Sequence, residues 1–172
     1  MTRRWKPSTT VAAIIEQDGR FLLVEEQTPQ GLRLNNPAGH LDEGESLIQA
    51  CARETLEETL YDFEPQALVG VYLTRAGQTA IGAAAEPGIT YLRFAFCGLL
   101  GALQSGRRLD KGIVRTLWLT PTELRASAEH HRSPMVLQGI EDYLVGQRFD
   151  LRLIHTDDSV TAKRFGQMGD AN

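Results

Sequence analysis

The chain has 172 residues, of which 42% are hydrophobic and 23% charged. This length suits one globular domain, whose core needs no disulfide or metal for stability. The 18 Lys and Arg residues against 22 Asp and Glu residues give a formal net charge of −4, which argues against binding a nucleic acid polymer, because that requires a basic face. The same charge is compatible with a small phosphorylated metabolite whose charge is balanced by a metal ion.

The first part of the chain predicts an arm, two strands paired across the turn Asp18-Gly19, a shaped loop and a helix. The strands are apolar and rich in β-forming residues, and the turn is a strong hairpin signal. Gly and Pro in the loop argue against a regular element there. Ser46 and Gln49 fit a capping box, and good helix formers continue to about Leu60. The arm is residues 1–8, the strands 9–16 and 20–26, and the loop 35–45.

The second part predicts three more strands, two helices and a polar tail. One helix begins at Thr120-Pro121, and another runs from Ser133-Pro134 to Gly146. The strands are expected at 67–74, 89–99 and 113–119, and a disordered tail at 155–172. Strands interspersed with helices indicate one α/β domain over 9–154, in which a mixed β-sheet lies between helices.

The sequence predicts no targeting or membrane segment. The apolar run 11–15 is too short for the hydrophobic region of a signal peptide, and the longest apolar stretch, 94–103, is half of a membrane span. Cys51 and Cys97 are too few for a disulfide framework and are not spaced as zinc ligands. We therefore expect a cytoplasmic protein with reduced thiols and no membrane partner. The sequence leaves open whether it is a monomer or a homodimer.

Three glutamates lie on one face of the predicted helix. At about 100° per residue, Glu54, Glu57 and Glu58 point into one arc of about 100°. Arg53 is four residues before Glu57 and within reach of its carboxylate. The opposite arc, which can face the core, contains Ile48, Ala52, Thr55, Leu56 and Thr59. One face of the helix is therefore expected to be buried, and the other to carry three carboxylates.

The crowded carboxylates point to a divalent cation. Like charges on adjoining helical turns repel one another, and a hard cation removes this repulsion. Mg²⁺ suits carboxylate oxygens, can bridge the oxygens of a diphosphate, and lowers the pKa of a bound water. The alternative is an ordinary solvated acidic face, and the helix alone does not distinguish between the two.

A longer motif favours the metal site. The pattern G-x5-E-x7-R-E-x-x-E-E is formed by Gly39, Glu45, Arg53, Glu54, Glu57 and Glu58. It resembles the signature of the Nudix hydrolases, which cleave phosphate or diphosphate esters of nucleoside and related compounds. Its chance occurrence in a chain of this length is on the order of 10⁻⁵. Thr55 and Leu60 depart from the family pattern; Leu60 replaces the usual glycine and is expected to remove the left-handed helix cap.

The similarity extends beyond this motif, to a bacterial phosphatase branch of the Nudix family. The segments that carry it are residues 6–16, 35–47, 91–98, 113–120 and 132–154. The resemblance implies an α/β/α sandwich and Mg²⁺ dependence, with Mn²⁺ as a possible substitute. It also implies release of phosphate from nucleoside tri- and diphosphates and from thiamine pyrophosphate or its hydroxymethylpyrimidine precursor.

The resemblance also implies roles for the residues of the motif. Glu57 and Glu58 correspond to the principal metal ligands. Glu54 corresponds to a glutamate that binds a second ion or orients the water, and Gly39 contributes its carbonyl. Arg53 corresponds to an arginine that fixes a glutamate carboxylate, so Glu54 and Arg53 are the candidate catalytic residues. The remaining position, Glu45, is expected to brace the loop against the helix.

Other residues are candidate substrate contacts. Arg93 alternates away from the apolar face of its strand, so it either meets a substrate phosphate or is solvated. His40 follows the loop glycine and either touches a phosphate or is an ordinary loop residue. Asp110 is either a further base or ligand, as on this loop in some Nudix enzymes, or a surface residue. Further candidates that border the loop are Arg33, Asn35 and Asn36.

The sequence therefore supports three hypotheses. The first is a Mg²⁺-dependent hydrolase in which water attacks the terminal phosphorus of a small pyrophosphate. The second keeps this chemistry with another substrate: an oxidised nucleotide, ADP-ribose or a dinucleoside polyphosphate. The third is a Nudix-like module that binds a nucleotide without hydrolysing it, for which Thr55 and Leu60 are the only support.

Overall fold

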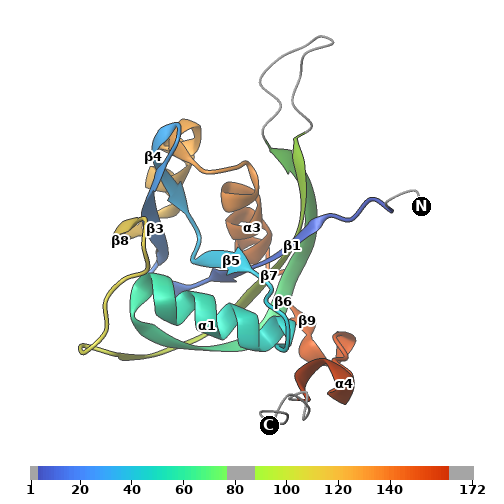
Figure 1. Cartoon of the computed structure of the whole chain (residues 1–172). Coiled ribbons are helices and arrows are strands. Elements are labelled where there is room, and N and C mark those ends of the chain that lie inside the picture. The colour runs from blue at the N-terminus through green and yellow to red at the C-terminus, as the bar shows by residue number, and fades with distance from the viewer. Residues whose placement is uncertain (1–3, 77–87, 163–172) are drawn as a thin grey trace, which may run out of the picture.

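The computed structural model describes residues 4–76 and 88–162, whose strands form two sheets (Figure 1). The first sheet has the order β5-β1-β7-β6-β9 and is mixed, because β1 and β7 are parallel whereas the other pairs are antiparallel. Its strands are β1 (Ser8–Ile14), β5 (Ala38–His40), β6 (Tyr61–Ala76), β7 (Ile89–Leu103) and β9 (Phe149–Asp150). In the second sheet β3 pairs with all three other strands. Its strands are β2 (Glu16–Gln17), β3 (Arg20–Thr28), β4 (Gly31–Asn35) and β8 (Ile113–Leu119).

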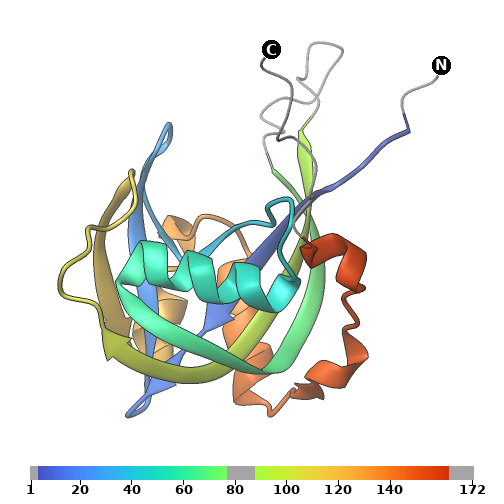
Figure 2. The same ribbon diagram turned by 60° about the horizontal axis from the view of Figure 1, so that its bottom comes forward.

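Helices cover both faces of these strands (Figures 1 and 2). The helices are α1 (Leu47–Thr59), α2 (Pro121–Ala126), α3 (Met135–Leu144) and α4 (Asp158–Thr161), with short 3₁₀ turns η1 (Ala128–His130) and η2 (Leu151–Leu153). Successive side chains of β1 point alternately into two hydrophobic cores, as expected for a buried strand. Val11 and Ala13 pack into the core that includes Cys51 of α1, whereas Ala12 and Ile14 pack with α2 and α3. The predicted α/β/α sandwich with a mixed sheet is therefore confirmed.

The residues that were predicted from the sequence to begin the helices do so in the structure. Ser46 caps α1 and forms the predicted capping box with Gln49. Thr120 and Glu123 form a second capping box at α2, with Pro121 at the first helical position. The third helix begins at Met135, directly after Ser133-Pro134, and is followed by Gly146 at a positive φ of 88°.

Leu60 does not abolish the left-handed helix cap, contrary to the expectation from the sequence. It adopts that conformation itself, with φ 65° and ψ 7°, and its N–H donates to the carbonyl of Leu56. Because a side chain in this region is unfavourable by about 1–2 kcal/mol, the turn retains the shape that glycine would give at a cost in local strain. The chain then passes directly into β6.

Two strands were not predicted from the sequence, and a third is longer than predicted. β4 lies where no strand was expected, and the loop predicted at 35–45 contains β5, which pairs with β1. The strand predicted at 67–74 begins at Tyr61 and includes Pro65 at an irregularity in the pairing with β7. These pairings use partners distant in the chain, so local Gly and Pro signals do not exclude them.

The ends of the chain are described in part. Of the tail predicted at 155–172, residues 155–162 include α4, so this part has regular structure, and 163–172 lie outside the described residues. The predicted domain boundaries at 9 and 154 stay predictions. Among the described helices, none combines the length and apolar character required to span a membrane.

Candidate active site

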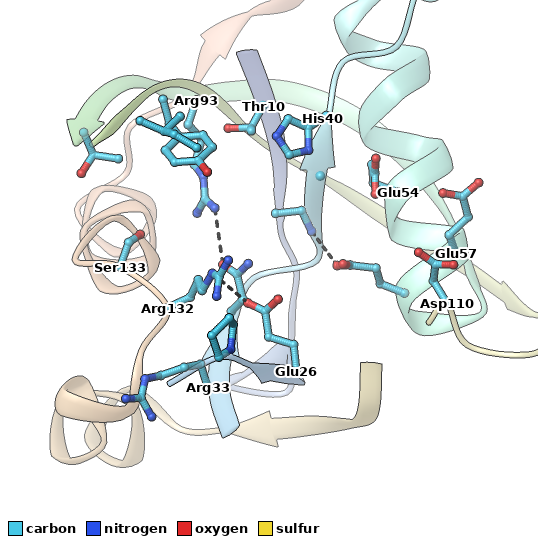
Figure 3. A pocket seen from close by; sticks show the side chains of 18 of the residues that line it. Thr10, Glu26, Arg33, His40, Glu54, Glu57, Arg93, Asp110, Arg132 and Ser133 are labelled. Atoms are coloured by element: carbon cyan, nitrogen blue, oxygen red, sulfur yellow. Dashed lines mark hydrogen bonds and ion pairs between the residues drawn. The ribbon is translucent and has the colours of Figure 1, made fainter. Parts of the chain in front are cut away.

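A pocket of about 920 Å³ opens between α1, β5 and the ends of β3, β4 and β7 (Figure 3). The predicted site residues in its lining are Arg33, Asn35, Gly39, His40, Arg53, Glu54, Glu57, Glu58, Arg93 and Asp110. Asn36 is not among them. Its side chain is buried, and its Oδ1 has no hydrogen-bond partner within the described part of the chain. The structure therefore does not support Asn36 as a substrate contact.

Glu58 is the most deeply buried of the three helix glutamates. The prediction that it lies opposite the buried face of the helix was wrong, because the buried side of α1 runs through Cys51, Thr55 and Glu58. The N–H of Ala38 donates to Glu58 Oε2 at 2.8 Å. Burial, with a smaller contribution from the nearby carboxylates of Glu54, Glu26 and Asp110, raises the pKa of Glu58 to about 8, although the Ala38 hydrogen bond acts in the opposite direction.

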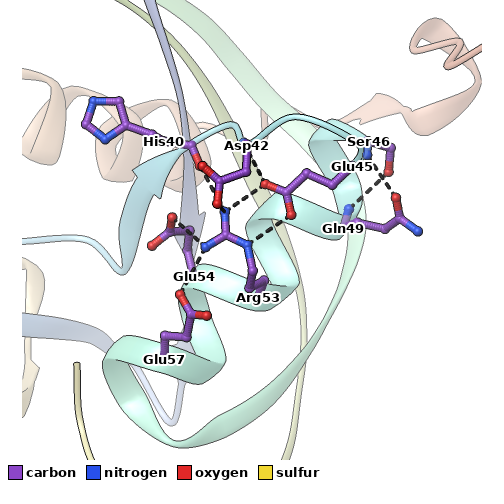
Figure 4. A network of polar contacts seen from close by, with 8 residues as sticks. All are labelled: His40, Asp42, Glu45, Ser46, Gln49, Arg53, Glu54 and Glu57. Atoms are coloured by element: carbon purple, nitrogen blue, oxygen red, sulfur yellow. Dashed lines mark hydrogen bonds and ion pairs between the residues drawn. The ribbon is translucent and has the colours of Figure 1, made fainter. Parts of the chain in front are cut away.

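Arg53 holds the other glutamates in place (Figure 4). Its guanidinium forms a bidentate pair with Glu45, with Nε to Oε2 at 2.9 Å and Nη2 to Oε1 at 2.7 Å. Nη1 donates to Glu54 Oε1 at 2.8 Å and to Glu57 Oε2 at 2.9 Å, the contact that the spacing predicts. Nη2 also donates to the carbonyl of His40. One planar cation thus orients three carboxylates and ties the loop to the helix.

Gly39 is required by the close approach of Glu54. A Cβ at position 39 would overlap the Glu54 carboxyl group, so only glycine allows this carboxylate to lie against the backbone of β5. Burial in this place raises the pKa of Glu54, with Arg53 acting in the opposite direction. The geometry brings the Gly39 backbone and the Glu54 carboxylate together, although they are 15 positions apart in the chain.

The oxygen donors at this end of the pocket fit a hard divalent cation. As the side chains lie, no three His, Cys, Asp or Glu residues in 4–76 and 88–162 are grouped closely enough to hold an ion together. The carboxylates of Glu54 and Glu57 form ion pairs with Arg53, and the Glu58 carboxylate accepts a hydrogen bond from the Ala38 N–H. Besides burial, the Glu57 carboxylate raises the pKa of Glu54, and the Glu54 carboxylate raises the pKa of Glu58. This is the like-charge crowding that a cation relieves.

Comparison with known proteins identifies the family. The model of the NUDIX domain matches residues 5–138, more than half of the chain. The chain belongs to the Nudix hydrolase family. It is therefore a hydrolase that acts on phosphoanhydrides, and its α1 and the preceding loop carry the Nudix motif.

Individual relatives agree with this membership. The chain is 33% identical over 150 residues to "Phosphatase NudJ" of Escherichia coli K12, covering 87% of this chain and 92% of the relative. It is 48% identical to a solved NUDIX hydrolase of Nitrosomonas europaea, with a TM-score of 0.80 over 89% of this chain and 99% of that one. The MutT protein of Methanosarcina mazei Go1, at 18% identity and a TM-score of 0.63 over 83% of this chain and 98% of that one, shares the fold.

Two further residues of the Nudix pocket lie beside the acidic helix. The N–H of Asp110 donates to the carbonyl of Glu57 at 2.9 Å, which places this aspartate in the pocket lining rather than on a remote surface. His40 is exposed, and its ring centre lies 6.2 Å from that of Tyr91 at an interplanar angle of 51°. Both side chains are therefore available to a ligand.

The opposite end of the pocket contains Arg93, Asn35 and two residues that sequence analysis missed, Glu26 and Arg132 (Figure 3). Arg93 is buried, which lowers its pKa to about 10, and its Nη2 donates to Asn35 Oδ1 at 3.4 Å. Arg132 Nε lies 3.6 Å from Glu26 Oε1. Glu26 could have been noticed in the sequence as a charged residue at the end of an apolar strand. No feature of the sequence pointed to Arg132.

Proposed function

We propose that this Nudix hydrolase is a Mg²⁺-dependent phosphatase of small pyrophosphates. Its proposed substrates are nucleoside tri- and diphosphates and thiamine pyrophosphate or its hydroxymethylpyrimidine precursor. The observation that carries the proposal is the carboxylate cluster organised by Arg53 and Gly39 at one end of a pocket large enough for such a molecule. The relative named as a phosphatase, which this chain matches over 92% of its length, supports the release of phosphate.

The residues of this chain have distinct proposed roles. Glu57 and Glu58, with the Gly39 carbonyl, would hold Mg²⁺, for which Mn²⁺ is a possible substitute. When bound, the ion supplies positive charge to the phosphate oxygens and lowers the pKa of a water. Glu54 orients the attacking water or contributes to a second ion, and Arg53 positions both Glu54 and Glu57. Phosphoryl transfer depends mainly on such positioning and charge neutralisation.

Substrate contacts are assigned to the remaining wall of the pocket. Arg93 has a buried guanidinium nitrogen free to donate, and Arg33 and His40 line the pocket with half-buried and exposed side chains, respectively. The acidic cluster would repel a polyphosphate in the absence of a cation. The proposal therefore requires activity to depend on a divalent ion.

The experiment is release of inorganic phosphate by purified protein from thiamine pyrophosphate, its pyrimidine precursor and nucleoside diphosphates. We expect turnover with Mg²⁺ or Mn²⁺ and none in excess EDTA. Equal turnover with and without EDTA would contradict the metal dependence. Product identity tests the bond: inorganic phosphate plus the monophosphate is expected from each diphosphate.

The alternative within the family is a different pyrophosphate substrate. The motif handles phosphates and metal, whereas other parts of the pocket select the leaving group, so an oxidised nucleotide, ADP-ribose or a dinucleoside polyphosphate uses the same carboxylates. A panel of these compounds, analysed for nucleoside monophosphate products, distinguishes them from the proposed phosphatase substrates. We also propose a cytoplasmic location, which the two buried, unbridged thiols Cys51 and Cys97 suit.

A further inference from the structure

The pocket contains buried polar atoms that have no hydrogen-bond partner among the described residues. Within the described residues, Thr10 Oγ1, Glu26 Oε1 and Arg93 Nη1 are buried and have no hydrogen-bond partner, and all three side chains line the pocket. A buried polar atom without a partner costs roughly 1–3 kcal/mol, so a protein rarely keeps several in one place without a ligand to pair with them. The three come from β1, β3 and β7, which meet only in the folded chain.

Asn35 lies beside both the donor and the acceptor. Its Oδ1 accepts from Arg93 Nη2 at 3.4 Å, and its amide is close enough to Glu26 to lower the pKa of that carboxyl, against the larger effect of burial, which raises it. Arg132 lies beside Glu26, with Nε 3.6 Å from Oε1, beyond hydrogen-bond distance. Figure 3 shows Arg93 and Arg132 at the end of the pocket opposite Glu54, Glu57 and Asp110, with Glu26 next to Arg132 on the side that faces α1.

The chemistry of this pair selects among possible ligands. A phosphate would accept from Arg93 Nη1 but would bring negative charge beside the Glu26 carboxylate. An apolar group would leave both orphaned atoms unpaired. A flat group with an acceptor next to an N–H donor pairs with both, and the Asn35 amide, which accepts from Arg93 and lies beside Glu26, has the same combination of acceptor and donor.

We propose that Arg93 and Glu26 recognise the leaving group of the substrate as a nitrogen heterocycle, through an edge that carries an acceptor beside an N–H donor. Pyrimidine and purine bases have this edge. Tyr91 and His40 supply a neighbouring aromatic wall. Thr10 of β1 is paired with His40 of β5 on one side and with Arg93 of β7 on the other. The inference deepens the proposed function and rests on it for the position of the diphosphate at the acidic end.

The kinetic test compares CDP with ribose 5-diphosphate, which lacks the base. The variants are Glu26→Gln, which keeps the side-chain volume, and Arg93→Met, which keeps the apolar stem. We expect each to lower kcat/KM for CDP by roughly 10- to 100-fold, as for loss of a hydrogen bond to a charged group, and to change kcat/KM for ribose 5-diphosphate by less than about threefold. Equal losses on both substrates would overturn the inference and leave the hydrolase function intact.

Glu25→Gln is the matched control. Glu25 precedes Glu26 on β3, is also paired with an arginine, Arg115 at 2.7 Å, and lies outside the pocket lining. This variant is expected to behave as the wild type on both substrates. If it lowers kcat/KM for CDP as Glu26→Gln does, the effect comes from disturbing β3 and the inference fails.

A binding test separates this inference from the proposed function. Ligand-observed NMR with cytidine, and with ribose as the ligand control, is carried out on metal-free protein in EDTA. Wild type and Glu58→Gln are expected to bind cytidine but not ribose, and Glu26→Gln and Arg93→Met to weaken cytidine binding at least tenfold. Cytidine binding without hydrolysis of any diphosphate would overturn the proposed function alone. Absence of cytidine binding to the wild type would overturn the heterocycle site.

Discussion

The two ends of the pocket are built in different ways. At the acidic end, Glu54, Glu57 and Glu58 come from adjoining turns of α1, and Arg53 on the same helix orients two of them. At the other end, Glu26 and Arg93 come from β3 and β7, and Arg132 from the segment between η1 and α3. Local spacing determines the first arrangement, whereas the second exists only after the sheets have formed.

This difference separates chemistry from selectivity. The acidic end holds like charges close together, and the structure tolerates this through Arg53, Gly39 and the Ala38 hydrogen bond to Glu58. The opposite end has opposite charges in contact and unpaired atoms that face the pocket. Substitutions at the acidic end should therefore impair all substrates alike, and those at the other end should change which substrate is preferred.

The largest effect is expected from Glu58→Gln. The amide keeps the volume and can still accept from the Ala38 N–H, but it removes the charge assigned to metal binding. We expect kcat for every diphosphate substrate to fall roughly 10²- to 10³-fold, measured as phosphate release with saturating Mg²⁺. In EDTA the melting temperature should rise, because a buried carboxylate beside other carboxylates becomes neutral.

The control for this prediction is Glu129→Gln, at an exposed residue outside the pocket lining. It should leave both activity and melting temperature unchanged. Undiminished turnover by Glu58→Gln would contradict the role assigned to Glu58. A loss confined to base-bearing substrates would contradict the division of the pocket into a chemical end and a selective end.

Arg53→Lys is expected to have the next largest effect. Lysine keeps the positive charge but cannot reproduce the planar fork that contacts Glu45, Glu54 and Glu57 at once. Loss of such a supporting contact typically lowers metal affinity or activity by roughly 10- to 100-fold. Mg²⁺ titrations of activity should show a higher half-saturating concentration with the variant, equally for CDP and ribose 5-diphosphate. An unchanged Mg²⁺ requirement would show that charge alone, and not the fork, organises the carboxylates.

Gly39→Ala tests the contact between the loop and the helix. The added methyl group would overlap the Glu54 carboxyl, so this carboxylate must move away from β5. We expect kcat to fall roughly tenfold, with little change in the preference between base-bearing and base-free substrates. The same substitution at Gly44, where a Cβ meets nothing within 4 Å but φ is 94°, controls for general loop strain. If Gly44→Ala lowers kcat as much, loop strain explains the effect and the steric argument fails.

The same contrast explains which parts of the molecule were predictable from the sequence. Ser46 with Gln49 and Thr120 with Glu123 start helices through contacts within four residues, and the Arg53–Glu57 pair follows from helix geometry. Strand β5 was missed because its partner residues in β1 lie 26 to 30 positions earlier, and local Gly and Pro residues suggested a loop. The buried position of Glu58 was missed because the burial of a helix face depends on how the helix is rotated against the sheet.

The smallest effect is expected from a substitution of Leu60 at the end of α1. It should change the stability of the protein and not its activity. Leu60→Gly relieves the strain of a left-handed residue, about 1–2 kcal/mol, but gains backbone freedom in the unfolded chain that offsets roughly half of it. We therefore expect a net stabilisation of about 0.5 kcal/mol, or an increase of roughly 1–2 °C in melting temperature.

Leu60→Ala loses the same side-chain contacts while keeping the strained conformation, so it should melt below the wild type. If Leu60→Gly melts as low as Leu60→Ala, then side-chain packing and not backbone conformation determines this position. Activity should be unchanged in both variants, because the carboxylates of α1 precede the cap and Leu60 lies outside the pocket lining.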